Sequence, residues 1–217
     1  MLRIGTPWIF TLGAGIYDAV TAQEPWRRHC ESMAAWVPGR RVLDLGVGPG
    51  VSTIALSRAA PATQFVGLDT SASMLARARR HGRTAGVPLA LVRGDALHLP
   101  FTGGAYDGAT GHSFLYLLPD SRAVLREVHR VVRPGGMVAF LEPNAIRGPR
   151  RWAAVRRALV ADLRFGVSML LWSVFSALHG RYTDARLGAE LTACGFVDPR
   201  VTTAFEGLGL VVVARRR

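Results

Sequence analysis

The sequence contains no lysine and only two cysteines among its 217 residues. All 27 basic residues are therefore arginines, and with 15 acidic residues they give a formal net charge of +12. An arginine-only chain rich in alanine, glycine and valine is typical of a GC-rich genome, which explains part of this charge. The remainder favours an anionic partner, such as a membrane surface or a nucleic acid.

The two cysteines, Cys30 and Cys194, are far apart in the sequence and match no metal-ligand spacing. This content argues against a disulfide-rich secreted scaffold, and it predicts no metal site. We expect both side chains to be reduced thiols in a cytoplasmic protein.

Long hydrophobic runs are also missing. The segment VSMLLWSVFSAL (167–178) is apolar all round, but it is shorter than the about 20 residues that a helix needs to span a bilayer. Near the start of the chain, residues 4–16 are apolar, but Pro7 interrupts them and a single arginine precedes them. We interpret residues 4–16 as an ordinary N-terminal segment rather than a signal peptide.

Short apolar runs alternate with helical segments along most of the chain. A helix is expected over 17–36, and the sequence then predicts strands at 40–46, 64–69, 88–95, 106–111 and 137–143, with helices at 50–60, 71–86 and 120–136. Continuous apolar strands separated by helices indicate an α/β fold, in which helices cover both faces of a parallel sheet.

The alternation stops after Pro143 and resumes only at residue 187. A helix is expected over 187–196, followed by two β-rich runs, 197–205 and 208–214, that form a closing hairpin. We predict one domain over 1–217, divided into a helical cap (1–38), a core (39–143), a helical insertion or lid (144–186) and a C-terminal helix with hairpin (187–217).

The stretch VLDLGVGPG (42–50) places three glycines at alternate positions directly after the first strand. Gly46, Gly48 and Gly50 let the backbone approach a ligand closely, and the following helix points free N–H groups at it. The spacing differs from the GxGxxG of dinucleotide sites. Asp44 lies within the strand itself, and a carboxylate there suits a ligand that carries a cation.

Two further acidic residues follow neighbouring strands. Asp69 ends the second strand, where a carboxylate can accept both hydroxyl groups of a ribose. Asp95 ends the third strand, where it can accept the amino group of adenine. Three acids at three successive strand ends imply a ligand with an amino acid part, a ribose and an adenine, which is S-adenosylmethionine.

This combination resembles the class I S-adenosylmethionine-dependent methyltransferases, closest in style to the ubiquinone/menaquinone C-methyltransferase-like group. The residues that carry the resemblance are LDLGVGPG (43–50), GLDTSASML (67–75), GDALHLPF (94–101) and LREVHRVVRPGGMVAFLEP (125–143). The family fold implies a Rossmann-like, seven-stranded, mostly parallel sheet with helices on both faces. Its last strand is antiparallel, and a helical insertion separates strands five and six.

The resemblance also implies roles for single residues. Those that bind S-adenosylmethionine would be Asp44, Gly46, Gly48, Gly50, Asp69, Thr70, Met74, Asp95, Ala96 and His112. His112 falls where the family lines the sulfonium, and it is the first candidate for a general base, with Tyr116 as a second catalytic candidate. Glu142, His179 and Tyr182 are expected to face the acceptor as well.

The acceptor is less well defined by the sequence. The fourth-strand segment GHSFLYLLPD lacks the acidic or Asn-Pro-Pro-Tyr signature of nucleic-acid N-methyltransferases, which disfavours DNA or RNA bases. We expect a small lipophilic acceptor, such as a quinone, a lipid or a natural-product intermediate, and a homodimer is compatible with the sequence. The alternatives are a phospholipid headgroup N-methyltransferase, a nucleic-acid-binding module and a non-catalytic cofactor-binding protein.

The insertion has an amphipathic pattern when it is taken as one helix from residue 149. One face holds Arg147, Arg150, Arg151, Arg157 and Arg164, and the opposite face holds Trp152, Val155, Leu159, Leu163 and Leu170. A basic face opposite an apolar face is typical of a helix that lies in a membrane interface, and it predicts peripheral contact with anionic lipid through 147–178. The alternative is an ordinary amphipathic helix packed on the protein's own sheet.

Overall fold

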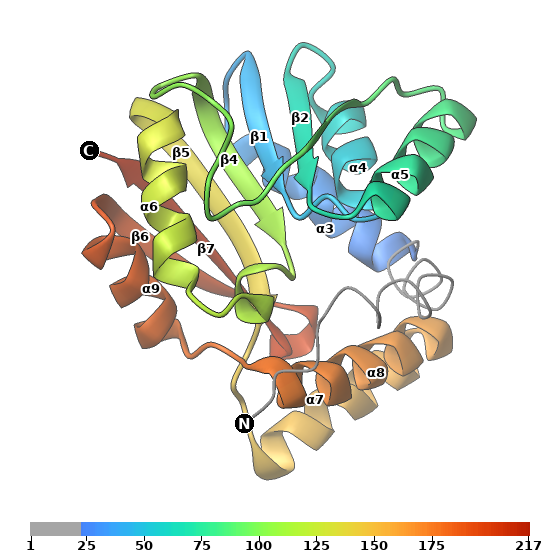
Figure 1. Ribbon diagram of the computed structural model, residues 1–217. Coiled ribbons are helices and arrows are strands. Elements are labelled where there is room, and N and C mark those ends of the chain that lie inside the picture. The colour runs from blue at the N-terminus through green and yellow to red at the C-terminus, as the bar shows by residue number, and fades with distance from the viewer. Residues whose placement is uncertain (1–22) are drawn as a thin grey trace.

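A computed structural model describes residues 23–217 of the chain (Figure 1). The apolar segment 4–16 and the first part of the helix expected over 17–36 lie outside the described residues. The remainder of that helix is α3 (Glu24–Met33), which is followed by the short turn η1 (Ala34–Trp36).

Seven strands form one sheet in the order β3-β2-β1-β4-β5-β7-β6. The strands are β1 (Arg41–Leu45), β2 (Gln64–Asp69), β3 (Ala90–Arg93), β4 (Tyr106–His112), β5 (Val132–Pro143), β6 (Phe196–Ala204) and β7 (Gly209–Arg216). Strands β1 to β5 pair in parallel, whereas β7 is antiparallel to both of its neighbours. The predicted Rossmann-like sheet with an antiparallel last strand is confirmed.

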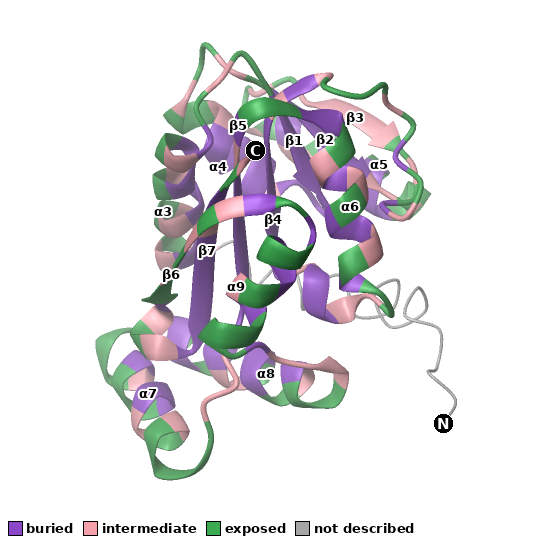
Figure 2. Cartoon of the chain, turned by 90° about the vertical axis from the view of Figure 1, so that its left-hand side faces the viewer, coloured by how far each residue is buried: buried purple, intermediate pink, exposed green. Residues whose placement is uncertain are grey.

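Helices cover both faces of this sheet and bury an apolar core on each. The remaining helices are α4 (Val51–Ala59), α5 (Ala72–Thr84), α6 (Ser121–Val131), α7 (Gly148–Ala161), α8 (Leu163–His179) and α9 (Asp184–Ala193). One core joins the sheet to α6 and α9 through side chains such as Leu125 and Leu187. The other joins it to α3, α4, α7 and α8 through Trp26, Leu56 and Val155. Figure 2 shows these buried positions facing the sheet.

Strand β5 begins earlier than the sequence indicates. The helix expected over 120–136 ends at Val131, and β5 already starts at Val132, where it pairs with Tyr106. The register then shifts before Gly108 pairs with Met137, so the segment containing Pro134 bulges out of the ladder. Proline cannot donate to a ladder, which is why this segment resembled a helix end rather than a strand.

The insertion between β5 and β6 leaves the sheet and returns to it at one place. Asn144 and Tyr182 form an isolated parallel bridge. The Tyr182 N–H donates to the Pro143 carbonyl at 2.9 Å, and the Ala145 N–H donates to the Tyr182 carbonyl at 2.7 Å. Helices α7 and α8 therefore project as a pair from a closed base, and both views place them across the carboxyl ends of the parallel strands (Figures 1 and 2).

The single helix expected from residue 149 is wrong, because the chain breaks at Asp162. The carboxylate of Asp162 caps α8 by accepting the Phe165 N–H at 2.9 Å. At the crossing of α7 and α8, a Cβ on Gly166 would lie 2.3 Å from the Cα of Leu159, so glycine is needed for this close approach. None of the helices within residues 23–217 combines the length and the apolar character that a membrane span requires.

Candidate functional site

The turn between β1 and α4 has a conformation that requires glycine. Gly46, Gly48 and Gly50 have φ angles of +63°, +52° and +88°, in the left-handed region that other residues rarely adopt. A Cβ on Gly46 would also lie 2.2 Å from the ring of Phe114. The sequence VLDLGVGPG thus gives a backbone that passes tightly around the start of α4, whose first N–H groups lack intrahelical partners.

Asp44 is buried directly beneath this turn and has polar partners. Its Oδ2 accepts hydrogen bonds from the hydroxyl groups of Ser52 at 3.1 Å and Thr53 at 2.6 Å, both in the first turns of α4. Its Oδ1 lies 3.7 Å from Nδ1 of His112 at the end of β4. A negative group is therefore held at the floor of the site by residues from two strands and one helix.

Asp69 connects the second strand to the glycine turn. Its Oδ2 accepts the Gly48 N–H at 2.9 Å, and its Oδ1 accepts the Ser71 N–H at 2.8 Å. Burial raises the pKa of this carboxyl, and the backbone hydrogen bonds oppose that effect. Each carboxylate oxygen has two lone pairs, and the Thr70 backbone is a third partner, so Asp69 keeps the capacity to accept a further hydrogen bond.

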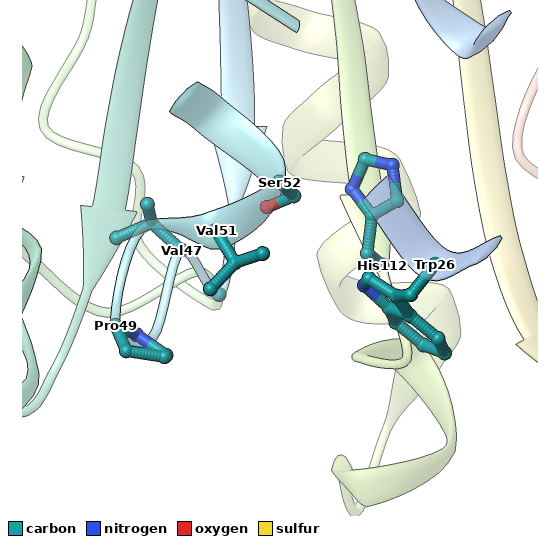
Figure 3. A pocket seen from close by; sticks show the side chains of 7 residues that line it. Trp26, Val47, Pro49, Val51, Ser52 and His112 are labelled. Carbon is teal, nitrogen blue, oxygen red and sulfur yellow. The ribbon is translucent and has the colours of Figure 1, made fainter. Parts of the chain in front are cut away.

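A recess opens beside the turn (Figure 3). It is lined by Trp26, Gly46, Val47, Pro49, Val51, Ser52 and His112. Trp26 and His112 lie on one side, and the residues of the turn and of α4 lie on the other. The recess therefore joins the glycine turn to the end of β4, where the sequence predicts the reacting group.

His112 is buried in this recess next to two groups that favour its protonated form. Burial opposes the charge, but Cys30 and the Asp44 carboxylate outweigh it and raise the pKa of His112 to about 10. Within residues 23–217, neither ring nitrogen of His112 has a hydrogen-bond partner. The raised pKa favours the protonated imidazole, whose ring N–H groups act as donors rather than as a base.

The loop after β4 is fixed from below by Glu142, which is fully buried in β5. The carboxylate accepts the N–H groups of Phe114, Leu115 and Tyr116 at 3.2, 2.8 and 3.2 Å. Burial raises the pKa of Glu142 to about 7, although these hydrogen bonds lower it. Glu142 thus holds the short turn η2 (Leu115–Leu117) against the sheet, and the expectation that it faces an acceptor stays a prediction.

Helix α8 also contributes to this loop. The Trp172 indole N–H donates to Oγ of Ser113 at 2.8 Å, and Ser113 has a left-handed φ of +56°. The ring of Trp172 packs edge-on against Trp26 with their centroids 5.8 Å apart. The helical pair is therefore connected to the wall of the recess.

The other predicted site residues lie around the recess without lining it. Thr70 and Asp95 are exposed, Met74 and Ala96 are buried, and Tyr116 is buried in η2. The Asp95 carboxylate accepts the Leu97 N–H at 2.9 Å, which orders the loop after β3. Their roles toward a ligand stay predictions.

Two of the residues expected to face the acceptor make local contacts within the protein. Tyr182 is buried in the core on the α6 and α9 side, where the Arg186 guanidinium lies over its ring. The imidazole of His179 contacts the Phe175 carbonyl within α8. Both side chains are occupied by local packing or hydrogen bonding.

Several site residues were not identified from the sequence. Trp26, Cys30 and Trp172 come from segments far from the glycine turn, and no local pattern places them beside it. Ser52 and Thr53 could have been predicted from the sequence, because hydroxyl side chains in the first turn of the helix after a glycine turn can bond to an acid in the preceding strand.

The arrangement fits S-adenosylmethionine. The turn offers backbone amides together with acidic and hydroxyl groups, and Asp69 retains acceptor capacity for a hydroxyl group. A buried carboxylate at Asp44 suits a ligand with positive charge better than a pyrophosphate. The unpartnered nitrogens of His112 point to a polar ligand in the recess.

Comparison with known proteins agrees with this geometry. Residues 42–136 match the protein family described as a methyltransferase domain. A demethylmenaquinone methyltransferase of Thermus thermophilus is 37% identical over 117 residues, which cover 54% of this chain and 53% of the relative. The chain spans about half the length of the curated relatives it matches.

Solved structures extend the similarity of fold to nearly the whole chain. A possible histamine N-methyltransferase from Thermotoga maritima superposes with a TM-score of 0.71 and 18% identity, covering 97% of this chain and 99% of that one. The [4+2]-cyclase SpnF superposes equally well, with 18% identity and coverage of 97% and 94%. The predicted resemblance is confirmed over residues 42–136, which match the methyltransferase-domain family, and the whole chain shares the fold of solved methyltransferases. This family implies S-adenosylmethionine as the cofactor.

Proposed function

We propose that the protein transfers a methyl group from S-adenosylmethionine to a small, lipophilic, quinone-like acceptor. The observation that carries the proposal is the junction of Asp44, Asp69 and the glycine turn with a recess that ends at His112. The curated relatives are named demethylmenaquinone methyltransferases, which supports a quinone-like acceptor. The match to the methyltransferase family ends before α7, so the acceptor rests on this resemblance and on the apolar side chains of Trp26, Val47 and Val51 in the recess wall.

The residues of the site have separable roles in this reaction. Gly46, Gly48 and Gly50 shape the backbone around the methionine part, and Asp69 holds the ribose. When bound, the cofactor supplies an electrophilic methyl group on a sulfonium, and transfer is an in-line displacement that depends on positioning. Trp26 and Trp172 exclude water from the wall of the recess.

His112 has a conditional role as a base. Its imidazole is protonated in the free protein, and a bound sulfonium cation nearby would lower its pKa by repulsion. His112 becomes able to accept a proton from a phenolic or enolic acceptor only after that change. His112 would then act as the base, and Tyr116 remains a second candidate from the adjoining turn.

The fold alone does not establish the chemistry, because a [4+2]-cyclase shares it. A phospholipid headgroup is the alternative acceptor. A peripheral membrane location is a further part of the proposal. A homodimer also stays a prediction.

A labelling experiment tests the proposal. The purified protein is incubated with methyl-labelled S-adenosylmethionine and, in parallel, with demethylmenaquinone reduced to its quinol in detergent micelles, with phosphatidylethanolamine vesicles or with total RNA. We expect label in the quinone fraction, and we expect Asp69→Ala to abolish most of it. Label in the phospholipid would replace the quinone by a headgroup acceptor, and label in RNA alone would contradict the proposal.

A further inference from the structure

Helix α8 has two apolar faces with different surroundings. Its inner face packs Phe165, Met169 and Trp172 into the protein. Its outer face carries five large apolar side chains that are between 44% and 79% exposed: Leu163, Val167, Leu171, Val174 and Leu178. Their spacing of three or four residues aligns them along one side of the helix, which we term the outer stripe of α8.

The outer stripe accounts for most of the exposed large hydrophobic surface. Within residues 23–217, the only other large hydrophobic side chains that are exposed are Trp152 and Val160, and both belong to α7. Single exposed leucines are ordinary on a protein surface, but an aligned row confined to one helical pair indicates an interaction site.

The same helical pair carries exposed positive charge. Arg147, Arg150, Arg156 and Arg164 on α7 and α8 are exposed and form no ion pair with any residue from 23 to 217. Two other arginines of the helical pair bond to side chains of the protein: Arg151 donates to Ser173, and Arg157 forms an ion pair with Glu206. Asp162 is the only acidic residue between 144 and 183.

This combination selects the partner. A second copy docked through the stripe would bring the exposed arginines of two chains together, each with a formal charge of +12, and their repulsion disfavours such a dimer. An anionic lipid surface attracts the same arginines and accepts the apolar row between its headgroups. We propose that the outer stripe of α8, together with the exposed arginines of the helical pair, is a docking surface for an anionic membrane.

The position of α8 connects docking to the reaction, and this connection rests on the proposed function. The inner face of α8 contacts the recess through Trp172, which donates to Ser113 and packs on Trp26. One helix thickness therefore separates the docking surface from the wall of the site. A lipophilic acceptor dissolved in the bilayer would reach the recess along the edge of this helix without crossing water.

The test is co-sedimentation of the full chain with vesicles. Vesicles of phosphatidylglycerol and phosphatidylcholine in equal parts are compared with pure phosphatidylcholine. We expect binding to the anionic vesicles, weakened by added salt because ionic strength screens the arginines. The triple variant Leu163→Gln, Leu171→Gln, Leu178→Gln should lower partitioning about tenfold or more, since apolar burial supplies the salt-insensitive part.

Charge variants separate the two contributions. Arg150→Gln with Arg156→Gln should reduce binding to anionic vesicles several-fold, each arginine near such a surface contributing to the attraction. Arg79→Gln with Arg80→Gln on α5 removes the same charge from another part of the exposed surface and should leave binding close to that of the wild type.

The outcomes distinguish docking from catalysis. The leucine variant should keep cofactor affinity, measured by calorimetry, and turnover of a short, water-soluble naphthoquinol, while it loses turnover of an acceptor held in vesicles. A wild-type chain that ignores both kinds of vesicle overturns the docking surface whatever its activity. A wild-type dimer that becomes a monomer in the leucine variant, without vesicle binding, would assign the stripe to a second copy instead. If no acceptor is methylated, vesicle binding alone still decides the docking.

Discussion

The region of the glycine turn and the helical pair α7–α8 depart in opposite ways from the usual pattern of apolar side chains inside and charged side chains outside. Around the turn, the carboxylates Asp44 and Glu142 are buried, at 1% and 0% exposure. On α8, apolar side chains are exposed instead, with Leu178 at 79%. Burying a carboxylate and exposing an apolar side chain both cost free energy. Hydrogen bonds within the protein compensate the buried carboxylates, whereas nothing within residues 23–217 covers the outer stripe of α8. We propose that the buried polar side chains mark the side that meets the cofactor and that the exposed apolar side chains mark the side that meets lipid.

The largest expected effect comes from filling the glycine turn. Gly46→Ala places a Cβ 2.2 Å from Phe114 in a left-handed backbone, and we expect a loss of about 3 kcal/mol in unfolding free energy together with loss of cofactor binding. Gly86 has nearly the same φ, +67°, but no atom within 4 Å of an added Cβ. Gly86→Ala should cost only about 1 kcal/mol, from backbone strain. Urea unfolding of both variants measures the difference, and equal losses would mean that strain alone, not the packing of the turn, sets the cost.

The next effect concerns cofactor affinity. Asp69→Ala should weaken S-adenosylmethionine binding by about 1.5–3 kcal/mol, because it removes charge-assisted hydrogen bonds to the ribose. This corresponds to roughly ten- to a hundredfold in the dissociation constant. Asp198→Ala, which changes a mostly exposed carboxylate at the sheet edge, is the matched control. Unchanged calorimetric affinity in a folded Asp69→Ala protein would remove Asp69 from the site.

A smaller effect is expected from pH. The pKa of His112 is raised to about 10, so its charge opposes a cationic ligand at neutral pH. Binding that lowers this pKa releases a proton, and affinity then rises between the lowered value and about pH 10, by up to about tenfold for each step of one in pH. S-adenosylhomocysteine lacks the sulfonium charge and should show a weaker dependence. His112→Asn should flatten the S-adenosylmethionine profile, and a slope that persists in this variant would assign it to another group.

The smallest effect belongs to the outer stripe in solution. Leu178→Gln should change the unfolding free energy by no more than about 0.5 kcal/mol, because this exposed side chain buries little apolar surface in the folded protein. Leu43→Ala in the core of β1 should cost about 2–5 kcal/mol. Thermal unfolding checks the contrast. A large loss for Leu178→Gln would show that the stripe is covered within the protein's own structure.

The sequence predicts the cofactor half well, because the signals there are local. The strand expected at 64–69 coincides with β2, and the glycines, Asp44 and Asp69 meet at one turn because parallel strands end at the same edge. The start of β5 could not be predicted, since it depends on pairing with Tyr106 from a distant segment.

The helical pair α7–α8 was predicted less well than the cofactor half, because its packing also depends on distant segments. Leu163 and Val155 share a face when the segment is taken as one helix, but the break at Asp162 leaves Leu163 exposed while Val155 is buried. Apolar periodicity shows which residues align on a helix, but not whether that face meets the sheet or the solvent. Trp26 and Trp172 were missed because their contact joins segments separated by most of the chain.

The bridge between Asn144 and Tyr182 has a consequence for how such enzymes diversify. Because the backbone departs and returns at adjacent positions, the length of the segment 145–181 can vary without altering the register of β5 or the start of α9. Recombination between relatives at these two points would transfer α7 and α8 together, provided that the incoming helices keep the contacts of Trp172 with Ser113 and Trp26. New specificities could then arise in one step on an already functional catalyst, rather than through many separate substitutions.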